Sequence, residues 1–349
     1  MGAIYMPGMD LGIDLGTSQV VITVAGRGVV LREPAVLAVD EKSGRMIACG
    51  REAYAMQGRA PSSIQVIRPL SKGVISDYDA AERMLKHLVG KVCAYKVLKP
   101  RAAVSVPAAV TEVEQRSVIE AVTAANVRRV VLMEESVAAA VGAGLDVAAA
   151  RGCMAADLGA GTVDVAVMTL RGVASSISAK VGGDDLDEAI IRFMRNKYNH
   201  IIGVLTAEQV KKTIGCALPG KPGDSMKVPG RDAVTGLPSV CQVTSQDIQE
   251  AITEPLEEMV GVIQRVLENT PPELAGDVMA GGIVLTGGLS RLNGMADLIA
   301  ERTGVACRIA GNPEECVALG LGKAIKYVDV MRSGVYDISQ FSYRLANPA

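Results

Sequence analysis

The chain has 349 residues, of which 49% are apolar and 21% are charged, a balance typical of a soluble globular protein with a large core. Its net charge of −2 excludes the strong basic field that nucleic-acid binding needs, so we expect no nucleic-acid partner. Seven cysteines without a CxxC pair and only two histidines argue against a zinc site, a disulfide framework and a Ser-His-Asp enzyme. The first ten residues lack secretory features, and charges interrupt the longest apolar region, 136–168. We therefore expect neither a signal peptide nor a membrane-spanning helix.

Strands and helices alternate along the first half of the chain. Residues 11–24 read as two strands around a turn at Gly16, and residues 29–39 as a strand broken at Pro34. The next elements expected are a helix over 78–92, a strand over 101–106, a helix over 111–125 that begins with a capping box, a strand over 130–133 and a helix over 136–143.

The second half of the chain repeats this pattern. Residues 153–170 read as a hairpin around DLGAGTVD, and the Gly- and Pro-rich segment 215–242 as turns and an edge hairpin. Helices are expected over 184–198, 207–214, 245–268 and 314–330, and a strand, a glycine turn and a helix start within 281–295. Because hairpins occur within each half, we expect a mixed α/β fold that is duplicated, with a cleft between the two copies.

Each copy opens with an Asp-Leu-Gly turn, DLGTSQ from Asp14 and DLGAGTVD from Asp157. A glycine turn lets backbone N–H groups approach an anion closely, and the hydroxyls of Thr17, Ser18 and Thr162 add donors. Carboxylates repel phosphate, so the two aspartates make sense if a divalent cation lies between them and the ligand. Mg²⁺ is commonly held by carboxylates, phosphates and water. The pair therefore predicts one magnesium-bound nucleotide flanked by Asp14 and Asp157.

A third glycine turn, Thr286-Gly287-Gly288, is placed to lie against the base or the ribose. One such turn alone is usually an ordinary strand turn. Two Asp-Leu-Gly turns followed by a TGG turn are much more specific, and together they resemble the phosphate-1, phosphate-2 and adenosine motifs of the actin-like ATPase superfamily.

Within that superfamily, the chain resembles the MreB family over nearly its whole length, from about residue 11 to residue 330. Segments similar to that family follow in the family's order: LGIDLGTSQVV, VLREPAVLAVD, IRPLSKGVISDYDAAERML, VVLMEESVAAAVGAGL, DEAIIRFMRNKYNHIIG, GRDAVTGLPS and TPPELAGDVMAGGIVLTGGLSRLNGM. The resemblance implies a duplicated actin-like ATPase fold of the ribonuclease H type, with two lobes around a nucleotide cleft. It places lobe I over 1–150 with 320–349 returning to it, lobe II over 151–319, and small subdomains over 31–75 and 181–250.

The resemblance also implies ATP and Mg²⁺ as cofactors and gives roles to individual residues. Glu135, Asp157 and Thr162 would be catalytic, with Glu135 where the superfamily positions the attacking water, and Asp14 and Asp157 would hold the metal through water. Asp164 would belong to the second phosphate turn. The residues expected to contact the nucleotide are Asp14, Gly16, Thr17, Ser18, Gly159, Ala160, Gly161, Thr162, Glu208, Lys211, Gly287 and Gly288.

A physical argument for Glu135 stands beside the resemblance. A glutamate between a strand and a helix can reach into a central cleft and hold a water in line with the terminal phosphate. The alternative is that Glu134 and Glu135 are charges favoured by the dipole at a helix N-terminus.

Four positions depart from the family pattern without removing a phosphate or metal residue. Ser136 replaces the proline of the usual EEP, and Leu289 replaces the third glycine of the adenosine turn. Thr213 stands where a glutamate near the ribose is frequent, and Ala160 stands where a glycine is frequent.

The family resemblance implies a slow ATPase that polymerises with itself. Its subunits would join head to tail, and such heterologous contacts do not close on themselves, so they propagate into a filament. It further implies a cytoplasmic protein at the inner face of the cell membrane, with membrane-bound cell-wall-synthesis proteins as partners and a role in bacterial cell shape. The alternative function is a non-polymerising small-molecule kinase of the same superfamily. A chaperone would need a substrate domain after the ATPase, and we expect none.

A candidate membrane contact is the segment KVCAYKVLKPR, residues 91–101. Tyr95, Val97 and Leu98 would enter the membrane while Lys91, Lys96, Lys99 and Arg101 face anionic headgroups. The alternative is a helix end that leads into a buried strand, with Val97 and Leu98 in the core. The N-terminal GAIYM is a second candidate anchor.

Overall fold

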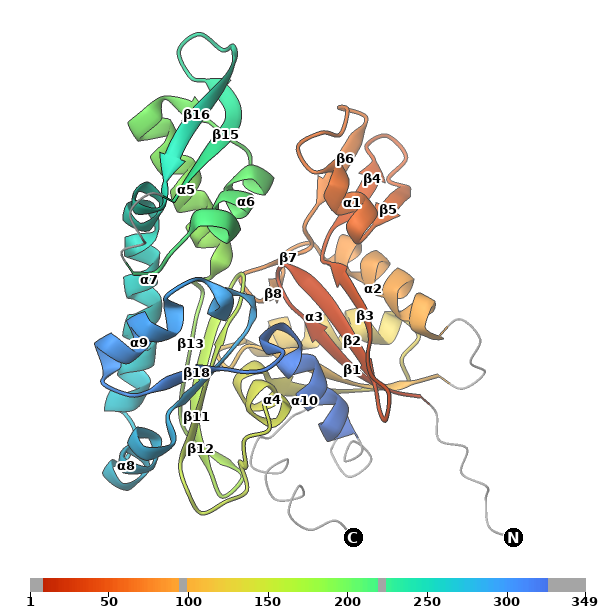
Figure 1. Cartoon of the computed structure of the whole chain (residues 1–349). Coiled ribbons are helices and arrows are strands. Elements are labelled where there is room, and N and C mark those ends of the chain that lie inside the picture. Colours follow the sequence, from red (N-terminus) through yellow and green to blue (C-terminus); the bar gives the residue numbers. More distant parts are fainter. Residues whose placement is uncertain (1–8, 94–98, 219–223, 326–349) are drawn as a thin grey trace.

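The computed structural model describes residues 9–93, 99–218 and 224–325. It has two lobes, each built on a five-stranded mixed sheet (Figure 1). We call lobe I the half built on the sheet of order β10-β9-β1-β2-β3, and lobe II the half built on β13-β12-β11-β17-β18. The expected mixed α/β fold with two similar halves is confirmed.

The sheet of lobe I places the first glycine turn at its centre. β1 pairs antiparallel with β2 through that turn and parallel with β9 on its other side. The strands are β1 (Asp10–Leu15), β2 (Gln19–Val24), β3 (Gly28–Pro34), β9 (Arg101–Val106) and β10 (Arg129–Glu134). One face packs against α2 (Tyr78–Cys93) and α3 (Glu112–Ala124) in a single apolar cluster. Thr111 is the N-cap residue of α3 and forms the expected capping box.

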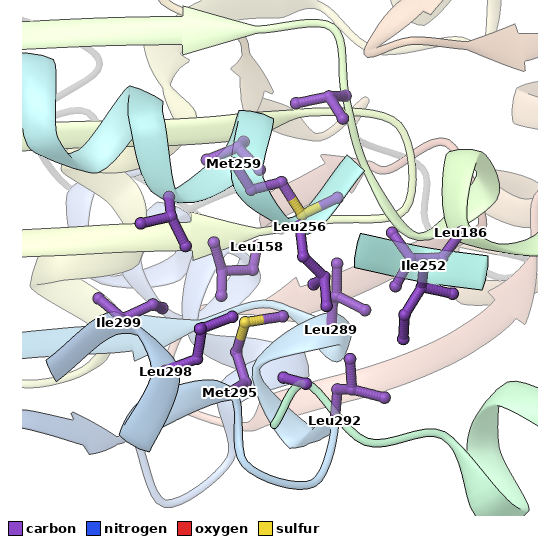
Figure 2. Packing of buried hydrophobic residues seen from close by; sticks show 14 of the residues in the cluster. Leu158, Leu186, Ile252, Leu256, Met259, Leu289, Leu292, Met295, Leu298 and Ile299 are labelled. Atoms are coloured by element: carbon purple, nitrogen blue, oxygen red, sulfur yellow. The ribbon is translucent and has the colours of Figure 1, made fainter. Parts of the chain in front are cut away.

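The sheet of lobe II repeats this arrangement around the second glycine turn. β11 pairs antiparallel with β12 and parallel with β17, as β1 does with β2 and β9. The strands are β11 (Cys153–Leu158), β12 (Val163–Thr169), β13 (Gly172–Ala179), β17 (Ile283–Thr286) and β18 (Cys307–Ile309). The covering helices are α5 (Gly183–Tyr198), α7 (Ser245–Glu268) and α9 (Met295–Thr303). Figure 2 shows this core, where Leu158 meets Leu256 and Met259 of α7 and Met295 of α9.

Two helices of small residues, α4 (Glu135–Gly142) and α10 (Cys316–Ala324), lie between the sheets of the two lobes. One buried cluster joins Ala103 of lobe I, Ala155 of lobe II, Ala138 of α4 and Leu321 of α10. The helix backbones touch: a Cβ on Gly320 would lie 1.9 Å from the carbonyl oxygen of Ala138. The lobes are therefore joined by a tightly packed pair of helices beneath the cleft.

Each lobe also carries a smaller sheet, and both stand at the same end of the molecule (Figure 1). On lobe I the small sheet is β5-β4-β6, beside α1 (Arg51–Met56), and on lobe II it is β14-β15-β16, beside α6 (Val204–Ile214). Their strands are β4 (Leu37–Asp40), β5 (Met46–Cys49), β6 (Ile64–Ile67), β14 (His200–Ile201), β15 (Ser225–Asp232) and β16 (Pro238–Thr244). A short hairpin, β7 (Leu70–Ser71) and β8 (Val74–Ile75), follows the small sheet of lobe I and lies on the side of lobe I that faces lobe II (Figure 1).

The expected elements are present over the described residues, but several others were not predicted. These include α1, β5, β6, β13 and α8 (Pro272–Gly281), and the run of Gly and Ala in α8 has little helical periodicity. The last expected helix begins at Cys316 after the 3₁₀ turn η2 (Pro313–Glu315), and its predicted end lies outside the described residues. No helix within 9–93, 99–218 and 224–325 has the length and apolar content needed to cross a bilayer.

Candidate functional site

A cavity of about 660 Å³ lies between the two lobes and is lined by residues of both. All the residues expected to contact a nucleotide line it, and Glu135 lines it too. They come from the three glycine turns, from the start of α4 and from α6. The volume is in the range of small-molecule sites, so the fold brings the predicted residues together around a space large enough for a ligand.

The first glycine turn follows β1 and is held by neighbouring strands. The hydroxyl of Ser105, on β9, donates to Asp14 Oδ1 at 3.0 Å and accepts from the backbone N–H of Leu15. Burial raises the pKa of Asp14 to about 6, and the hydrogen bond from Ser105 opposes that rise. The hydroxyl of Thr17 accepts a hydrogen bond of 3.0 Å from the backbone N–H of Gly73.

The second glycine turn follows β11 and lies in close contact with the first glycine turn. A Cβ on Gly161 would lie 2.4 Å from the hydroxyl oxygen of Thr17, so no larger residue fits between the turns. Thr286 donates a hydrogen bond of 2.6 Å to Asp157 Oδ1. Burial raises the pKa of Asp157 to about 7, the bond from Thr286 opposes the rise, and the charge of Asp14 adds to it.

The carboxyl groups of Asp14, Glu135 and Asp157 line the cavity, and that of Asp164 lies behind them, close enough for its charge to act on Glu135. The pKa of Glu135 is raised well above its usual value, first by burial and then by the charges of Asp164, Asp14 and Asp157. Buried like charges destabilise one another, and a divalent cation would relieve that repulsion. Within the described residues, no three or more His, Cys, Asp or Glu side chains form a metal site by themselves. Asp14 and Asp157 therefore fit a magnesium ion that takes its remaining ligands from phosphate and water.

Glu135 begins α4 yet is only 6% exposed, because its side chain points toward lobe II. The hydroxyl of Thr162 donates to its carboxylate at 3.5 Å. Glu135 is thus an acidic residue in the first turn of a helix and also part of the cavity wall. Asp164 is fully buried behind the cavity, where it accepts a hydrogen bond of 3.3 Å from the backbone N–H of Ala108.

The third glycine turn packs directly on the second. Gly287 has φ +78°, and a Cβ there would lie 2.3 Å from the carbonyl oxygen of Leu158, so both conformation and space require glycine. Its N–H donates to the carbonyl of Pro313 at 2.8 Å. The turn continues into the 3₁₀ segment η1 (Gly288–Arg291).

α6 contributes Glu208 and Lys211, which already have partners in this structure. The hydroxyl of Tyr54 in lobe I donates to Glu208. Lys211 is buried, pairs with Asp187 at 2.8 Å and donates to the carbonyl of Gly183 at 2.6 Å. Lys211 therefore also fixes the start of α5 beside the second glycine turn.

Several cavity residues have no signal in the sequence. Arg32 of β3, Arg291 of η1 and Glu314 of η2 line the cavity, and Glu314 forms ion pairs with both arginines, at 3.2 Å from Arg291. The three residues are far apart in the chain, and in the sequence they cannot be told from ordinary surface charges. The fold brings them together.

The four positions that depart from the family pattern lie in different surroundings. Leu289 packs into the core of lobe II (Figure 2), and Thr213 donates a hydrogen bond of 2.7 Å to the carbonyl of Gln209 in its own helix. Ala160 lines the cavity. Ser136 is buried, and its hydroxyl has no hydrogen-bond partner among the described residues.

The candidate membrane residues Tyr95, Val97 and Leu98 lie outside the described residues. Arg101, which we expected to face headgroups, does not: it is buried in β9 and pairs with Asp10 at 2.6 Å. That expectation was wrong because the partly buried carboxylate of Asp10 compensates the charge of the guanidinium.

Comparison with known proteins agrees with the fold. The MreB/Mbl protein family model matches residues 8–333. The cell shape-determining protein MreB of Escherichia coli (strain K12) is 43% identical over 327 residues, which cover 92% of this chain and 94% of that protein. The cell shape-determining protein Mbl of Bacillus cereus (strain ATCC 10987 / NRS 248) is 41% identical over 321 residues, with 92% and 96% covered.

Among solved structures, the crystal structure of MreB 5 of Spiroplasma citri bound to AMPPNP matches with a TM-score of 0.87 at 33% identity. The match covers 93% of this chain and 97% of that chain, and it confirms the expected actin-like ATPase fold with two lobes. With a family model over nearly its whole length and relatives above 40% identity, this chain belongs to the MreB/Mbl family.

Proposed function

We propose that this chain is a cytoskeletal protein that binds Mg-ATP, hydrolyses it slowly and polymerises into membrane-associated filaments that help maintain bacterial cell shape. The observation that carries the proposal is the meeting of three glycine turns and the carboxylates of Asp14 and Asp157 on one cavity between two lobes. Two relatives above 40% identity are named cell shape-determining proteins, and a relative at 33% identity was solved with AMPPNP, an analogue of ATP.

In this proposal the backbone N–H groups of 16–18 and 159–162 hold the phosphates, and Asp14 and Asp157 hold Mg²⁺ through water. The metal, when bound, would neutralise charge on the phosphates. Thr17 and Thr162 add hydroxyl donors. The ribose and base would lie toward Glu208, Lys211, Gly287 and Gly288, all on the cavity wall.

Glu135 is the proposed acceptor for the attacking water, with Asp157 and Thr162 as the other catalytic residues. It lines the cavity, and burial and neighbouring carboxylates raise its pKa, which strengthens it as an acceptor of the proton of the attacking water. The bond from the Thr162 hydroxyl would keep the carboxylate directed into the cavity.

Nucleotide state would act on assembly through the relative position of the lobes. A nucleotide that touches both lobes favours their closed arrangement, and closure would change the surface offered to the next subunit. We propose the lobe limits given by the sequence, 1–150 with 320–349 and 151–319, with small subdomains over 31–75 and 181–250.

Membrane binding is proposed for the segment around Tyr95, Val97 and Leu98, at the inner face of the cytoplasmic membrane. Basic residues beside it would each add about 1 kcal/mol on an anionic surface. Membrane-bound cell-wall-synthesis proteins would be the partners there. Replacing Val97 and Leu98 with Ser should abolish sedimentation with anionic liposomes, and retained binding would move the anchor to another segment.

Sedimentation with and without Mg-ATP, on and off lipid, tests the proposed function. We expect the protein to pellet with Mg-ATP and to release phosphate slowly as it does so. A protein that stays in the supernatant under all these conditions, yet phosphorylates a small alcohol, would instead be a kinase of the same superfamily.

A further inference from the structure

Polar contacts cross between the lobes along the rim of the cavity. From lobe I, Tyr54 reaches Glu208 of α6 and Arg68 reaches Asp184 of α5, the latter at 3.5 Å. A third contact, the ion pair of Lys72 with Asp185, lies nearest the two phosphate turns. This ion pair differs from the other two contacts because the backbone of Lys72 and Gly73 touches both phosphate turns.

Lys72 and Gly73 form the tip of the β7–β8 hairpin, with φ values of 50° and 76°. The N–H of Gly73 donates to the hydroxyl of Thr17 in the first phosphate turn at 3.0 Å. On the other side, the backbone N and Cα of Lys72 lie 3.0 Å from the point where a Cβ on Gly161 would be. The hairpin tip is therefore wedged between the first and second phosphate turns.

The partner of Lys72 leads back to the second phosphate turn. One carboxylate oxygen of Asp185 pairs with the Lys72 ammonium, and the other accepts the N–H of Gly182 at 2.8 Å. The next two N–H groups of this segment donate to the second turn: Gly183 to the carbonyl of Gly159 at 3.1 Å and Asp184 to that of Ala160 at 2.8 Å. One side chain of lobe I is thus tied, through the start of α5, to the backbone that would hold the phosphates in lobe II.

We propose that Lys72 is a positioning residue for nucleotide binding: its ion pair with Asp185 holds the β7–β8 tip and the two phosphate turns in the closed arrangement. This inference rests on the proposed function, since it assumes that the two turns bind the phosphates of one nucleotide. Lys72 does not touch the ligand; it acts through Gly73 on Thr17 and through Asp185 on the second turn. Breaking the pair lets the turns separate, so bound nucleotide leaves faster while the chemical step stays unchanged.

The side chains of Lys72 and Asp185 are 34% and 27% exposed, so solvent screens the pair and the effect of removing it is moderate. We expect a three- to fivefold change, roughly the range measured for ion pairs of this kind.

The test is a double-mutant cycle of Lys72→Met, Asp185→Asn and both together. Asn keeps an oxygen that can accept the N–H of Gly182, so Asp185→Asn removes the charge and leaves the start of α5 capped. The matched control is Lys197→Met, which breaks ion pairs with Asp247 and Glu250 that lie within lobe II.

Each variant is measured for release of a fluorescent ATP analogue, for steady-state ATP hydrolysis and for hydrogen exchange without nucleotide. We expect each single variant to speed release and to raise KM about three- to fivefold with kcat unchanged, and the double variant to match the singles. Lys72→Arg should restore the original values. In nucleotide-free protein, the same variants should exchange faster over 70–76 and 159–162, and Lys197→Met should not.

Three results would overturn the role of Lys72. They are additive effects of the two substitutions in the double-mutant cycle, a loss confined to kcat, and unchanged hydrogen exchange over 70–76. If the unmodified chain binds no Mg-ATP, the proposed function fails, and the exchange measurement alone decides whether Lys72 holds the two turns together.

Discussion

The hydroxyl of Thr286 donates a hydrogen bond of 2.6 Å to the carboxylate of Asp157 across two paired parallel strands, β17 and β11. This bond fixes the side chain of the aspartate and joins the second glycine turn to the third. It also opposes the rise that burial causes in the pKa of Asp157. The proposed metal residue is therefore positioned by the element that begins the proposed adenosine turn.

Replacing Thr286 with Val keeps the shape of the side chain and removes the hydroxyl. Asp157 then loses a hydrogen bond to its charged form, a loss of about 1–3 kcal/mol, so Mg-ATP should bind roughly tenfold more weakly. Titration calorimetry at pH 7.5 measures this. Thr286→Ser, which keeps the hydroxyl, is the control and should bind as the original chain does; equal affinity of the Val and original proteins would show that the bond has no part in binding.

The buried carboxyl of Asp157 should destabilise the nucleotide-free protein above neutral pH. Its pKa is about 7 in the folded protein against an ordinary value of 3.8, so the folded state binds the proton more tightly than the unfolded state. Stability therefore falls as pH rises from about 4 to about 7 and stays low above that. Asp157→Asn, which keeps an acceptor for Thr286, should raise the free energy of unfolding at pH 8 by an amount on the order of 2–4 kcal/mol.

Urea denaturation of the two proteins at pH 8 and at pH 4.5 measures that difference, which should shrink at the lower pH. Asp157→Asn should at the same time lose Mg²⁺-dependent ATP binding. A variant that is less stable than the original chain at pH 8 would contradict the burial argument, whatever its affinity.

Glu135→Ala should keep nucleotide binding and nearly stop phosphate release. Loss of a group that holds the water and accepts its proton costs roughly two to four orders of magnitude in turnover. Single-turnover hydrolysis with bound Mg-ATP separates this from weaker binding, and Glu135→Gln tests whether the proton acceptor or only the hydrogen bond is needed. Turnover within threefold of the original in the Ala variant rules out the catalytic role.

Gly320→Ala should destabilise the joint between the lobes. Its Cβ would lie 1.9 Å from the carbonyl oxygen of Ala138, a backbone atom that moves only if α4 and α10 separate. Overpacking of this kind costs about 1–3 kcal/mol or more, measured as a lower midpoint of thermal unfolding. Gly276→Ala in α8, where a Cβ meets no atom within 4 Å, is the matched control and should gain about 0.5–1 kcal/mol. A loss as large in the control would show that the α4–α10 contact is not the cause.

The sequence predicted the repeated framework well because its signals are local. The Asp-Leu-Gly turns, the capping box at Thr111 and the helical spacing over 78–92 each depend on a few neighbouring residues, and all appear where expected. The Asp14 and Asp157 turns line one cavity, as the argument from phosphate and magnesium chemistry requires.

What the sequence did not reveal depends on contacts between distant segments. No residue near Glu314 in the sequence indicates that it pairs with Arg32. Likewise, nothing around Lys72 in the sequence indicates that it lies between the phosphate turns. Arg101 was assigned to a membrane face because it follows other basic residues, and its partner Asp10 stands 91 positions earlier. A run of basic residues in the sequence does not reveal such ion pairs, because tertiary packing decides which charges are compensated.

Asp14 and Asp157 are proposed to meet one magnesium-bound nucleotide between the lobes, and a crystal structure of this chain with Mg²⁺ and AMPPNP would decide whether they do. We predict phosphates against the N–H groups of 16–18 and 159–162, with the metal between them and the two aspartates. Nucleotide bound outside the cavity, or a metal that approaches neither carboxylate, would rule this out.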